Sequence, residues 1–253
     1  MSNCDAVVFN GEGTLHHGNG GNLFEKCLLA KELGKKVFLI NSLWEKNEKS
    51  RQFLELFDLI SVRDSTVKEN VINDGYTGEV VVTPDMIFLD PDDTLPKSSV
   101  PMLAFVDSVK RETSKRLFAL AKKRECNFYS MSESEQKGVK PHRLAHLLDN
   151  PPAFPFSLLV SGRFHASCLA IKSGIPVLSI KSNTAKTEGM LSDANISLDH
   201  YFLHSARDLT EERLRAFIHG DHGRFLDAAH DYAREADKRI QSLFDILRRR
   251  IKS

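Results

Sequence analysis

The segment 158–186 has the pattern of a strand, a helix and a second strand, followed by a polar turn. An apolar run at 158–160 gives way to a helical pattern over 163–172. Gly174 stands where such a helix would end, and a second apolar run occupies 176–180. A crossover helix between two strands predicts that these strands are parallel and belong to one sheet.

The same alternation extends over most of the chain and predicts an α/β fold. Strands are expected at 5–9, 36–41, 59–62, 79–82, 102–106, 127–131, 158–160 and 176–180. Helices are expected at 23–33, 49–57, 65–75 and 109–125, near 142–148, at 163–172, from 186 onward and from 211 to the end. A segment rich in Asp and Pro, 90–101, separates two such series and is the expected linker. We therefore predict two Rossmann-like parallel-sheet domains with a cleft between them, at 1–95 and 96–208, and C-terminal helices at 209–253.

The C-terminal segment carries a helical stripe of apolar residues that requires a surface to pack against. The stripe is spaced by three and four until its last step: Leu226, Ala229, Ala233, Ala236, Ile240, Leu243, Leu247 and Ile251. The chain's own domains would supply this surface; a second subunit, giving a homodimer through this helix, is the alternative. The basic residues at 247–252 would compensate the helix dipole or, alternatively, contact an anionic membrane surface.

The composition argues against several classes of function. A formal net charge of +1 gives no reason to expect nucleic-acid binding, and 41% apolar with 27% charged residues is typical of a globular protein. The sequence has no run of 18 apolar residues and no signal-peptide pattern at its N-terminus. Its four cysteines include no Cys-x-x-Cys pair, so we expect reduced thiols, a cytoplasmic location and no zinc site.

The turn that follows the apolar run at 158–160 has the residue types of an anion site. A helix N-terminus offers unpaired N–H groups and the positive end of the helix dipole. Arg163 adds donors that suit phosphate or carboxylate, and His165 adds a group that can transfer a proton. A second polar turn follows the next strand: Ser182, Asn183, Thr184 and Lys186. Helix capping and a solvated lysine would also explain this second turn, but the two turns together favour anion binding.

The first predicted strand, 5–9, opens into the turn Asn10-Gly11-Glu12-Gly13. Asn10, Gly11, Gly13 and His16 would line the cleft. This turn is not a dinucleotide-binding fingerprint, but it allows a close backbone approach with a carboxylate at its tip. Glu12 would act as a general acid or base, or would be a solvated turn residue. His16 is followed directly by another histidine, and adjacent side chains do not share a helix face, so the pair does not predict a metal site.

Two more polar residues follow predicted strands of the first domain. Arg63 would contact an anion, or would form a salt bridge with Asp64 or Asp85. Asp85 follows a proline, so it would line the cleft or serve as turn chemistry. No motif in the chain requires a metal ion.

These motifs together resemble the polysaccharide pyruvyl transferase family. The resemblance covers roughly residues 5–192 and rests on Val8-Phe-Asn-Gly-Glu-Gly-Thr-Leu-His16, Ser61-Val-Arg-Asp-Ser65, Thr83-Pro-Asp85, Gly162-Arg-Phe-His165, Gly174-Ile-Pro176 and Ser182-Asn-Thr-Ala-Lys186. The family resembles GT-B glycosyltransferases, with two Rossmann-like domains and a C-terminal helix that returns to the first. Longer members have a strand and a helix before the Gly-Glu-Gly block. The resemblance therefore implies an abbreviated acceptor domain at 1–95 and a donor domain at 96–208.

The resemblance also implies an activity, the transfer of pyruvate from phosphoenolpyruvate to two hydroxyls of a cell-surface polysaccharide as a ketal. Arg163 would bind the phosphate or carboxylate of the donor, and His165 would protonate the enol methylene. Lys186 would offset charge on the departing phosphate, and Glu12 would accept the proton of the attacking hydroxyl. No cofactor is expected. The acceptor would be a glycan or a lipid-linked oligosaccharide, placing the protein in the cytoplasm or peripherally at the inner face of the membrane.

Two alternatives remain open on the sequence. A GT-B glycosyltransferase would use the same polar turns to hold a nucleotide-activated sugar, and a CMP-linked acidic sugar would suit them because it also carries a carboxylate. A binding subunit without catalytic activity, paired with an active partner, is the second alternative. The short N-terminal part favours this second alternative, the inactive binding subunit.

Overall fold

The computed structural model describes residues 4–12, 15–89, 102–131, 142–143 and 156–253. Its contacts divide the chain into two compact units. Unit 1 consists of residues 1–89 and 235–253, and unit 2 consists of residues 90–234. The expected linker, with the expected domain boundary after residue 95, lies outside the described residues. The segment 209–253, expected as a separate part, is shared between the two units.

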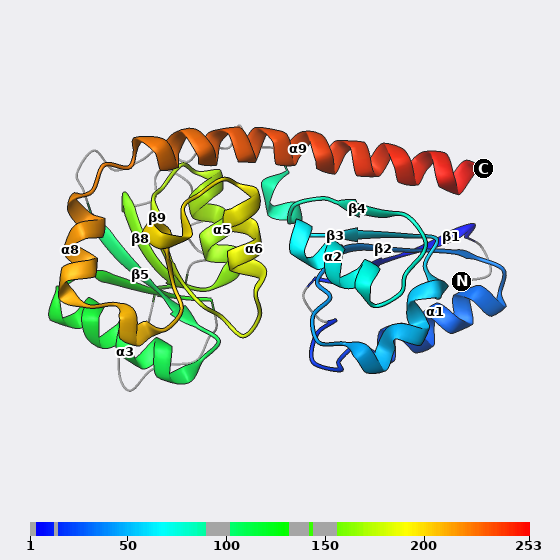
Figure 1. Cartoon of the computed structure of the whole chain (residues 1–253), viewed down its shortest axis with the longest axis horizontal. Helices are drawn as coiled ribbons and strands as arrows, with labels where there is room; N and C mark the ends of the chain where they lie inside the picture. The colour runs from blue at the N-terminus through cyan, green and yellow to red at the C-terminus, as the bar shows by residue number, and fades with distance from the viewer. Residues whose placement is uncertain (1–3, 13–14, 90–101, 132–141, 144–155) are drawn as a thin grey trace. The chain divides into compact units, whose positions relative to one another are not determined.

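Unit 1 is built on a four-stranded parallel sheet with the order β1-β2-β3-β4. In chain order it contains β1 (Ala6–Asn10), α1 (Gly21–Glu32), β2 (Lys36–Ser42), η1 (Glu48–Leu56), β3 (Leu59–Val62), α2 (Ser65–Asn73), β4 (Val80–Val82), η2 (Met86–Phe88) and the later part of α9 (Gly223–Lys252) (Figure 1). The helix predicted at 49–57 is confirmed, and it is the 3₁₀ helix η1. Its tighter winding aligns residues three apart, and Phe53 and Leu56 both pack against the core in this way.

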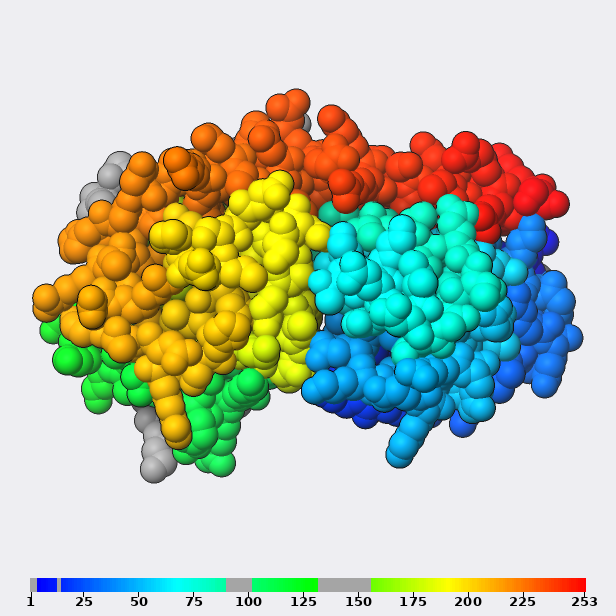
Figure 2. Space-filling view, in the orientation of Figure 1, coloured from blue at the N-terminus to red at the C-terminus, as the bar shows by residue number. Residues whose placement is uncertain are grey.

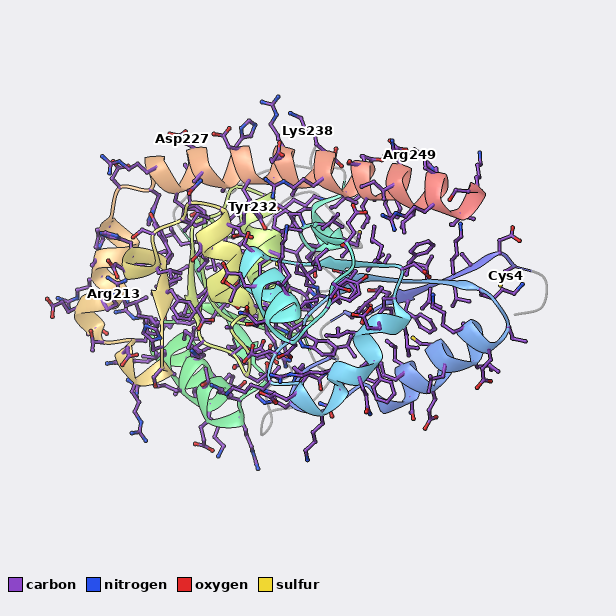
Figure 3. The ribbon with its side chains drawn as sticks, turned by 45° about the vertical axis from the view of Figure 1, so that its right-hand side comes forward. Cys4, Arg213, Asp227, Tyr232, Lys238 and Arg249 are labelled. Atoms are coloured by element: carbon purple, nitrogen blue, oxygen red, sulfur yellow. The ribbon has the colours of Figure 1, made fainter. Side chains whose placement is uncertain are left out.

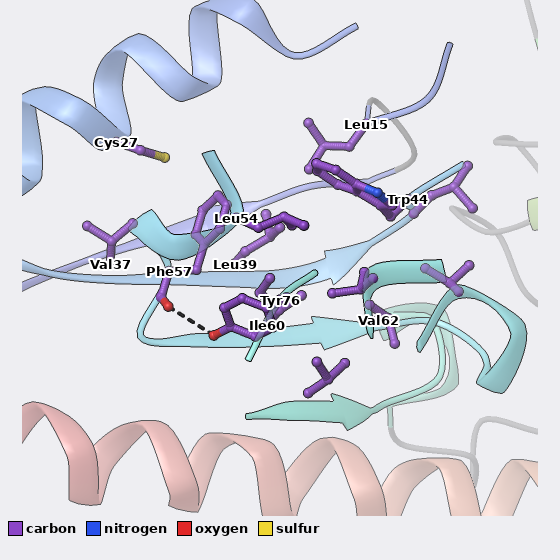
Figure 4. Packing of buried hydrophobic residues seen from close by; sticks show 14 of the residues in the cluster. Leu15, Cys27, Val37, Leu39, Trp44, Leu54, Phe57, Ile60, Val62 and Tyr76 are labelled. Carbon is purple, nitrogen blue, oxygen red and sulfur yellow. Dashed lines mark hydrogen bonds between the residues drawn. The ribbon is translucent and has the colours of Figure 1, made fainter. Parts of the chain in front are cut away.

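Alternating side chains of the strands divide the core of unit 1 between the two faces of its sheet. On β2, Val37 and Leu39 point into a cluster formed with α1, η1 and α2 (Figure 4). In the same cluster the Tyr76 hydroxyl donates to the Phe57 carbonyl oxygen at 2.9 Å, and burial raises the pKa of Tyr76 to about 12. Phe38 points to the other face and is fully buried.

Helix α9 covers this other face of the unit 1 sheet. Its residues Leu243 and Leu247 pack against Phe38 and Leu59. The Arg250 side chain fixes the end of the helix, because it donates to the Asp58 carbonyl oxygen at 2.8 Å and pairs with Glu79. Figure 3 shows Asp227, Lys238 and Arg249 on the opposite, exposed side of the helix.

The apolar stripe of α9 is therefore covered by the chain itself. The stripe residues that are buried are Ala229, Ala233, Ala236, Ile240, Leu243 and Leu247. Leu226, at the start of the stripe, is exposed. A homodimer through this helix and a membrane contact of its basic end stay predictions.

Unit 2 is built on a six-stranded parallel sheet with the order β10-β9-β8-β5-β6-β7. In chain order it contains β5 (Leu103–Ser108), α3 (Arg111–Lys123), β6 (Asn127–Ser130), β7 (His142–Arg143), β8 (Leu158–Gly162), α5 (Phe164–Lys172), β9 (Val177–Ile180), α6 (Lys186–Asp193), α7 (Leu198–Tyr201), β10 (Phe202–Leu203), η3 (Ala206–Asp208), α8 (Glu211–His219) and the first part of α9. The strand–helix–strand pattern at 158–180 is confirmed as β8-α5-β9. The short helix predicted near 142–148 is wrong at 142–143, which form β7 and pair with β6, and its other residues lie outside the described ranges.

The helix predicted from 211 to the C-terminus is interrupted. Gly220 has an extended conformation, with φ −70° and ψ 157°, which ends α8. Asp221 then accepts a hydrogen bond from the Gly223 N–H at 2.9 Å and starts α9. This break cannot be predicted from the spacing of apolar residues, because the backbone conformation of one residue ends α8 without changing that spacing.

Candidate functional site

The turn between β8 and α5 places Arg163 and His165 at the carboxyl end of the unit 2 sheet. Arg163 is the N-cap residue, in an extended conformation, and His165 lies half-buried in the first turn of α5. Gly162 makes this turn possible. A Cβ atom at Gly162 would lie 2.5 Å from the Ser108 Cβ and 2.9 Å from the Asp107 carbonyl oxygen, so only glycine lets β8 approach the end of β5 this closely.

Arg163 is held by a partner that the sequence analysis missed. Asp107, at the end of β5, accepts hydrogen bonds from Arg163 Nε at 2.8 Å and from Nη2 at 2.7 Å. The Ser130 hydroxyl, at the end of β6, donates to the same carboxylate at 2.8 Å. The Asp107 side chain is 5% exposed and that of Arg163 is 20% exposed. A two-pronged pair of this kind fixes the plane of the guanidinium, and Nη1 has no hydrogen-bond partner among the described residues.

Serines fix the backbone of the same arginine. The Ser161 hydroxyl accepts from the Arg163 N–H at 3.1 Å and donates to the Arg163 carbonyl oxygen at 3.0 Å. The Ser167 hydroxyl donates to that carbonyl oxygen at 3.1 Å, and it accepts from the Ser179 hydroxyl on β9 at 3.0 Å. The side chain and the peptide of Arg163 are thus both positioned before any ligand binds.

The second polar turn lies next to the first. Lys186 Nζ is 5.2 Å from the centre of the Phe164 ring, and the ring of His165 meets Phe164 edge-on at 5.3 Å between centroids. The first turns of α5 and α6 therefore meet at Phe164. Arg163, His165 and Lys186 are three groups able to carry positive charge, and they are grouped at two helix N-termini.

The start of α6 lacks a conventional cap. Its N-cap residue is Ala185, which supplies no side-chain hydrogen bond. Thr184 is buried, and its hydroxyl has no hydrogen-bond partner among the described residues. The Ser182 hydroxyl donates to Asn183 Oδ1 at 3.1 Å. A buried hydroxyl beside an uncapped helix start is costly unless a ligand or a water binds it, so helix capping does not explain Thr184.

In unit 1, the turn after β1 has the close backbone approach that its glycines suggest. The Gly11 N–H donates to the Ile40 carbonyl oxygen at 2.8 Å, and a Cβ atom at Gly11 would lie 2.7 Å from the Ser42 Cβ. Glu12 is exposed and has a left-handed backbone, with φ 44°. Asn10 Oδ1 accepts from the Glu12 N–H at 3.3 Å and holds this tip. Gly13 lies outside the described residues.

Asn41 is a second residue that the sequence analysis missed. It lies where the β2–β3 register shifts, and it is buried with a left-handed φ of 52°. Its side-chain amide donates to Asn10 Oδ1 at 3.1 Å, and its Oδ1 accepts from Arg63 Nε at 2.9 Å. A buried asparagine with this backbone conformation joins the ends of β1, β2 and β3 into one polar network.

Arg63 forms a salt bridge with Asp85, which is one of the two roles predicted for it. Its Nε lies 3.1 Å from Asp85 Oδ2, and its side chain is 1% exposed. Asp85 also accepts from the Ile87 N–H at 3.1 Å and caps η2, which is its expected turn role. Asp64 instead caps α2, where it accepts from the Val67 N–H at 2.9 Å.

His16 lies on the chain beside Glu45, in a single parallel bridge. It is half-buried, and its ring meets the ring of His17 edge-on. Within the part of the chain that the structure describes, no group of three or more His, Cys, Asp or Glu side chains is arranged to hold a metal ion.

The sequence was compared with protein families and with known proteins. The family described as "Polysaccharide pyruvyl transferase" matches residues 2–143, which is more than half of the chain. The chain belongs to the polysaccharide pyruvyl transferase family. The match includes the Gly-Glu-Gly turn, Arg63, Asp85 and Asp107, and it ends before Arg163. No curated protein matches the sequence.

The chain is also similar to solved structures. MurG from Acinetobacter baumannii is 13% identical, and the match covers 97% of this chain and 73% of MurG with a TM-score of 0.56. An uncharacterised protein from Klebsiella pneumoniae is 15% identical over 81% of this chain and 78% of its own, with a TM-score of 0.49. The glycosyltransferase SnogD from Streptomyces nogalater is 11% identical over 92% and 96%, with a TM-score of 0.41. The predicted fold class, α/β with two Rossmann-like parallel sheets and a GT-B-like fold, is confirmed by the likeness to MurG.

Family membership settles the general activity of the chain. The protein is a transferase of polysaccharide biosynthesis, and its acceptor is a glycan. None of the helices in the described ranges is long and apolar enough to cross a membrane.

Proposed function

We propose that the protein transfers the pyruvyl group of phosphoenolpyruvate to two hydroxyls of a sugar, and that the donor binds to unit 2. The observation that carries this proposal is the grouping of Arg163, His165 and Lys186 at the first turns of α5 and α6. Phosphoenolpyruvate presents a phosphate and a carboxylate on a small skeleton, so it suits two adjacent helix N-termini with cationic side chains.

The contacts suggest how the two turns would share the donor. Arg163 is held along its Nε–Nη2 edge by Asp107, so Nη1 would be the donor that meets one anionic group. The Thr184 hydroxyl and Lys186, with the N–H groups at the start of α6, would meet the other. Ser182 and Asn183 complete the rim of this turn.

The reaction is balanced by its own two substrates. His165 would give a proton to the methylene carbon of the donor, which forms a methyl group and leaves an oxocarbenium-like centre at the adjacent carbon. One sugar hydroxyl adds there and loses its proton. Departure of phosphate regenerates the cationic centre, the second hydroxyl adds, and its proton leaves in turn. The products are the ketal and inorganic phosphate, and no oxidant or reductant is consumed. Lys186 would stabilise the departing phosphate.

Glu12 stays the candidate for the base that accepts a hydroxyl proton. It belongs to unit 1, where its carboxylate is exposed at the tip of the turn after β1. A Glu12→Gln variant would bind phosphoenolpyruvate as the wild type does and lose transfer.

The family makes the acceptor a glycan. We further propose that this glycan is carried on a lipid, which would place the protein at a membrane surface.

The donor is tested by calorimetric titration of the full chain with phosphoenolpyruvate, and separately with CMP and UDP. Binding of phosphoenolpyruvate and not of the nucleotides supports the proposal. Lys186→Ala should weaken this binding by roughly tenfold, because it removes a charged partner of an anion. Lys122→Ala, which removes an exposed lysine from α3 of the same unit, is the matched control and should change nothing.

Two results would overturn the donor assignment. Binding of CMP or UDP in place of phosphoenolpyruvate would identify a glycosyltransferase that uses a nucleotide sugar. Binding of none of the three would remove phosphoenolpyruvate as the donor. If phosphoenolpyruvate binds, His165→Asn should retain binding and lose transfer, and unchanged transfer would remove His165 from its role as acid.

A further inference from the structure

Unit 2 contains a cavity that is separate from the donor site, since none of the donor-site residues lines it. Its volume is about 520 Å³, within the range of small-molecule pockets. It lies between the end of α6, helix α7 and the start of α9, and its lining residues are Asn195, Ile196, Ser197, His200, Tyr201, Asp221, Arg224 and Phe225. Figure 2 shows the amber and orange atoms of this region together on the face toward the viewer. We propose that this cavity binds a neutral sugar ring of a glycan.

The floor of the cavity is apolar and aromatic. Ile196, Tyr201 and Phe225 are all buried side chains, and the rings of Tyr201 and Phe225 lie 4.7 Å apart between centroids. The apolar C–H groups of a pyranose can pack against such a floor, whereas its hydroxyls require polar partners at the edges.

The floor is held rigidly by a hydrogen-bonded histidine. His222 Nε2 lies 2.9 Å from the Phe217 carbonyl oxygen, which only accepts, so this nitrogen carries the proton. His222 Nδ1 is then the acceptor for the Tyr201 hydroxyl at 3.0 Å. The Tyr201 ring is fixed by this chain of bonds, so the shape of the floor exists before a ligand arrives.

The rim carries both donors and acceptors. Its exposed polar residues are Asn195, Ser197, His200, Asp221 and Arg224. Two of them are oriented by the protein, because Asp221 accepts from the Gly223 N–H at 2.9 Å and His200 Nδ1 lies 2.9 Å from the Ser197 hydroxyl. A sugar hydroxyl both donates and accepts, so neighbouring hydroxyls can satisfy a carboxylate and a guanidinium at the same time.

The charges of the rim argue for a neutral ligand. The start of α9 would attract an anion, but the carboxylate of Asp221 already occupies this helix N-terminus. Arg224, in the first turn of the same helix, has the opposite charge. The acidic and the basic side chain together leave no excess of either sign, in contrast to the cationic donor site around Phe164. The proposal therefore does not rest on phosphoenolpyruvate as the donor.

The test follows the imidazole resonances of His200 by NMR in the full chain. The probes are methyl α-mannopyranoside, methyl β-galactopyranoside and N-acetylglucosamine, each at millimolar concentrations, and inorganic phosphate. A saturable shift with at least one sugar and none with phosphate is expected. Asp221→Asn keeps the helix cap, and Arg224→Gln keeps a polar side chain; each should weaken sugar binding by roughly tenfold.

Matched controls lie further along the exposed side of α9. Asp227→Asn and Arg234→Gln make the same charge changes outside the cavity and should leave sugar binding unchanged. The proposal is overturned if no sugar shifts His200, if phosphate alone shifts it, or if all four variants bind sugar equally. Calorimetry with phosphoenolpyruvate on the same variants should show unchanged donor binding, so failure here is distinguishable from failure of the donor site.

Discussion

The carboxylate of Asp107 holds the guanidinium of Arg163 by two parallel hydrogen bonds, 2.8 Å from Nε and 2.7 Å from Nη2. The two residues are 56 positions apart in the chain, and the parallel pairing of β5 with β8 brings them together. An arginine fixed in this way need not be ordered when an anion binds, and this lowers the entropic cost of binding.

The strength of this pair is measurable by a double-mutant cycle. Arg163→Ala removes the guanidinium that pairs with the buried Asp107 carboxylate, so we expect the Asp107→Ala/Arg163→Ala double variant to be more stable than Arg163→Ala alone. The coupling energy from urea unfolding should be about 1–3 kcal/mol. The exposed pair Glu112–Lys115 is the control, with an expected coupling below about 0.5 kcal/mol. Equal couplings for the two pairs would contradict a special role for Asp107.

The left-handed backbone of Asn41 predicts an unusual order of variants. Asn41→Gly and Asn41→Ala both lose the side-chain bonds to Asn10 and Arg63, but only alanine is strained at φ 52°. Asn41→Ala should therefore unfold more easily than Asn41→Gly, by about 1 kcal/mol in chemical denaturation. At Asn70, inside α2, the order should be reversed because glycine is the poorer helix former. The same order at both positions would refute the strain.

A methyl group at Gly162 should disturb the donor turn. Gly162→Ala places a carbon 2.5 Å from the Ser108 Cβ, and the overpacking should cost about 1–3 kcal/mol of stability. Donor binding should weaken as well, because Arg163 is the next residue. The control is Gly21→Ala at the start of α1, where the added carbon meets open space. A change in unfolding free energy within about 0.5 kcal/mol is expected for this control.

The Tyr201–His222 contact predicts a pH dependence of stability. Burial lowers the pKa of His222 below its ordinary value of 6.5. The unfolded chain therefore binds this proton more readily. The stabilising contribution is complete above pH 6.5 and is lost as the pH falls through the lowered pKa of the folded state.

His222→Gln keeps a donor and an acceptor but does not titrate. Its unfolding free energy should decline less between pH 7.5 and pH 5 than that of the wild type, as measured by urea unfolding at each pH. His230→Gln, an exposed histidine on α9, should follow the wild type. If His222→Gln also follows the wild type, the lowered pKa does not affect stability.

The elements of the fold were largely predictable because their signals are local. The apolar run at 158–160, the helical pattern at 163–172 and Gly174 lie within one βαβ unit, and the observed β8, α5 and β9 follow them closely. The helix start at Lys186 was predictable for the same reason. Breaks that depend on one or two backbone angles were not predictable, and Gly220 between α8 and α9 is the clearest case.

The residues of the candidate site were predictable only where they share a turn. Arg163 and His165 lie two positions apart in one motif. Asp107 is distant in sequence, and its role becomes visible only when β5 is known to pair with β8. The role of Asn41 could not be predicted either, because nothing in the sequence distinguishes an asparagine with a left-handed backbone from one in a regular strand. The role of Asp107 depends on the pairing of distant strands, and that of Asn41 depends on its backbone conformation.

The path of α9 has a consequence for dissecting the protein. The chain leaves unit 1 near residue 89 and returns to it near residue 235 within a single helix, so unit 1 is not one continuous stretch of sequence. A fragment ending at residue 89 would leave Phe38 and Leu59 without Leu243 and Leu247 and would tend to aggregate through this bared face. A circular permutant that joins residue 253 to residue 1 through a linker, and opens the chain between the two units, would carry unit 1 as a contiguous, separately expressible sequence.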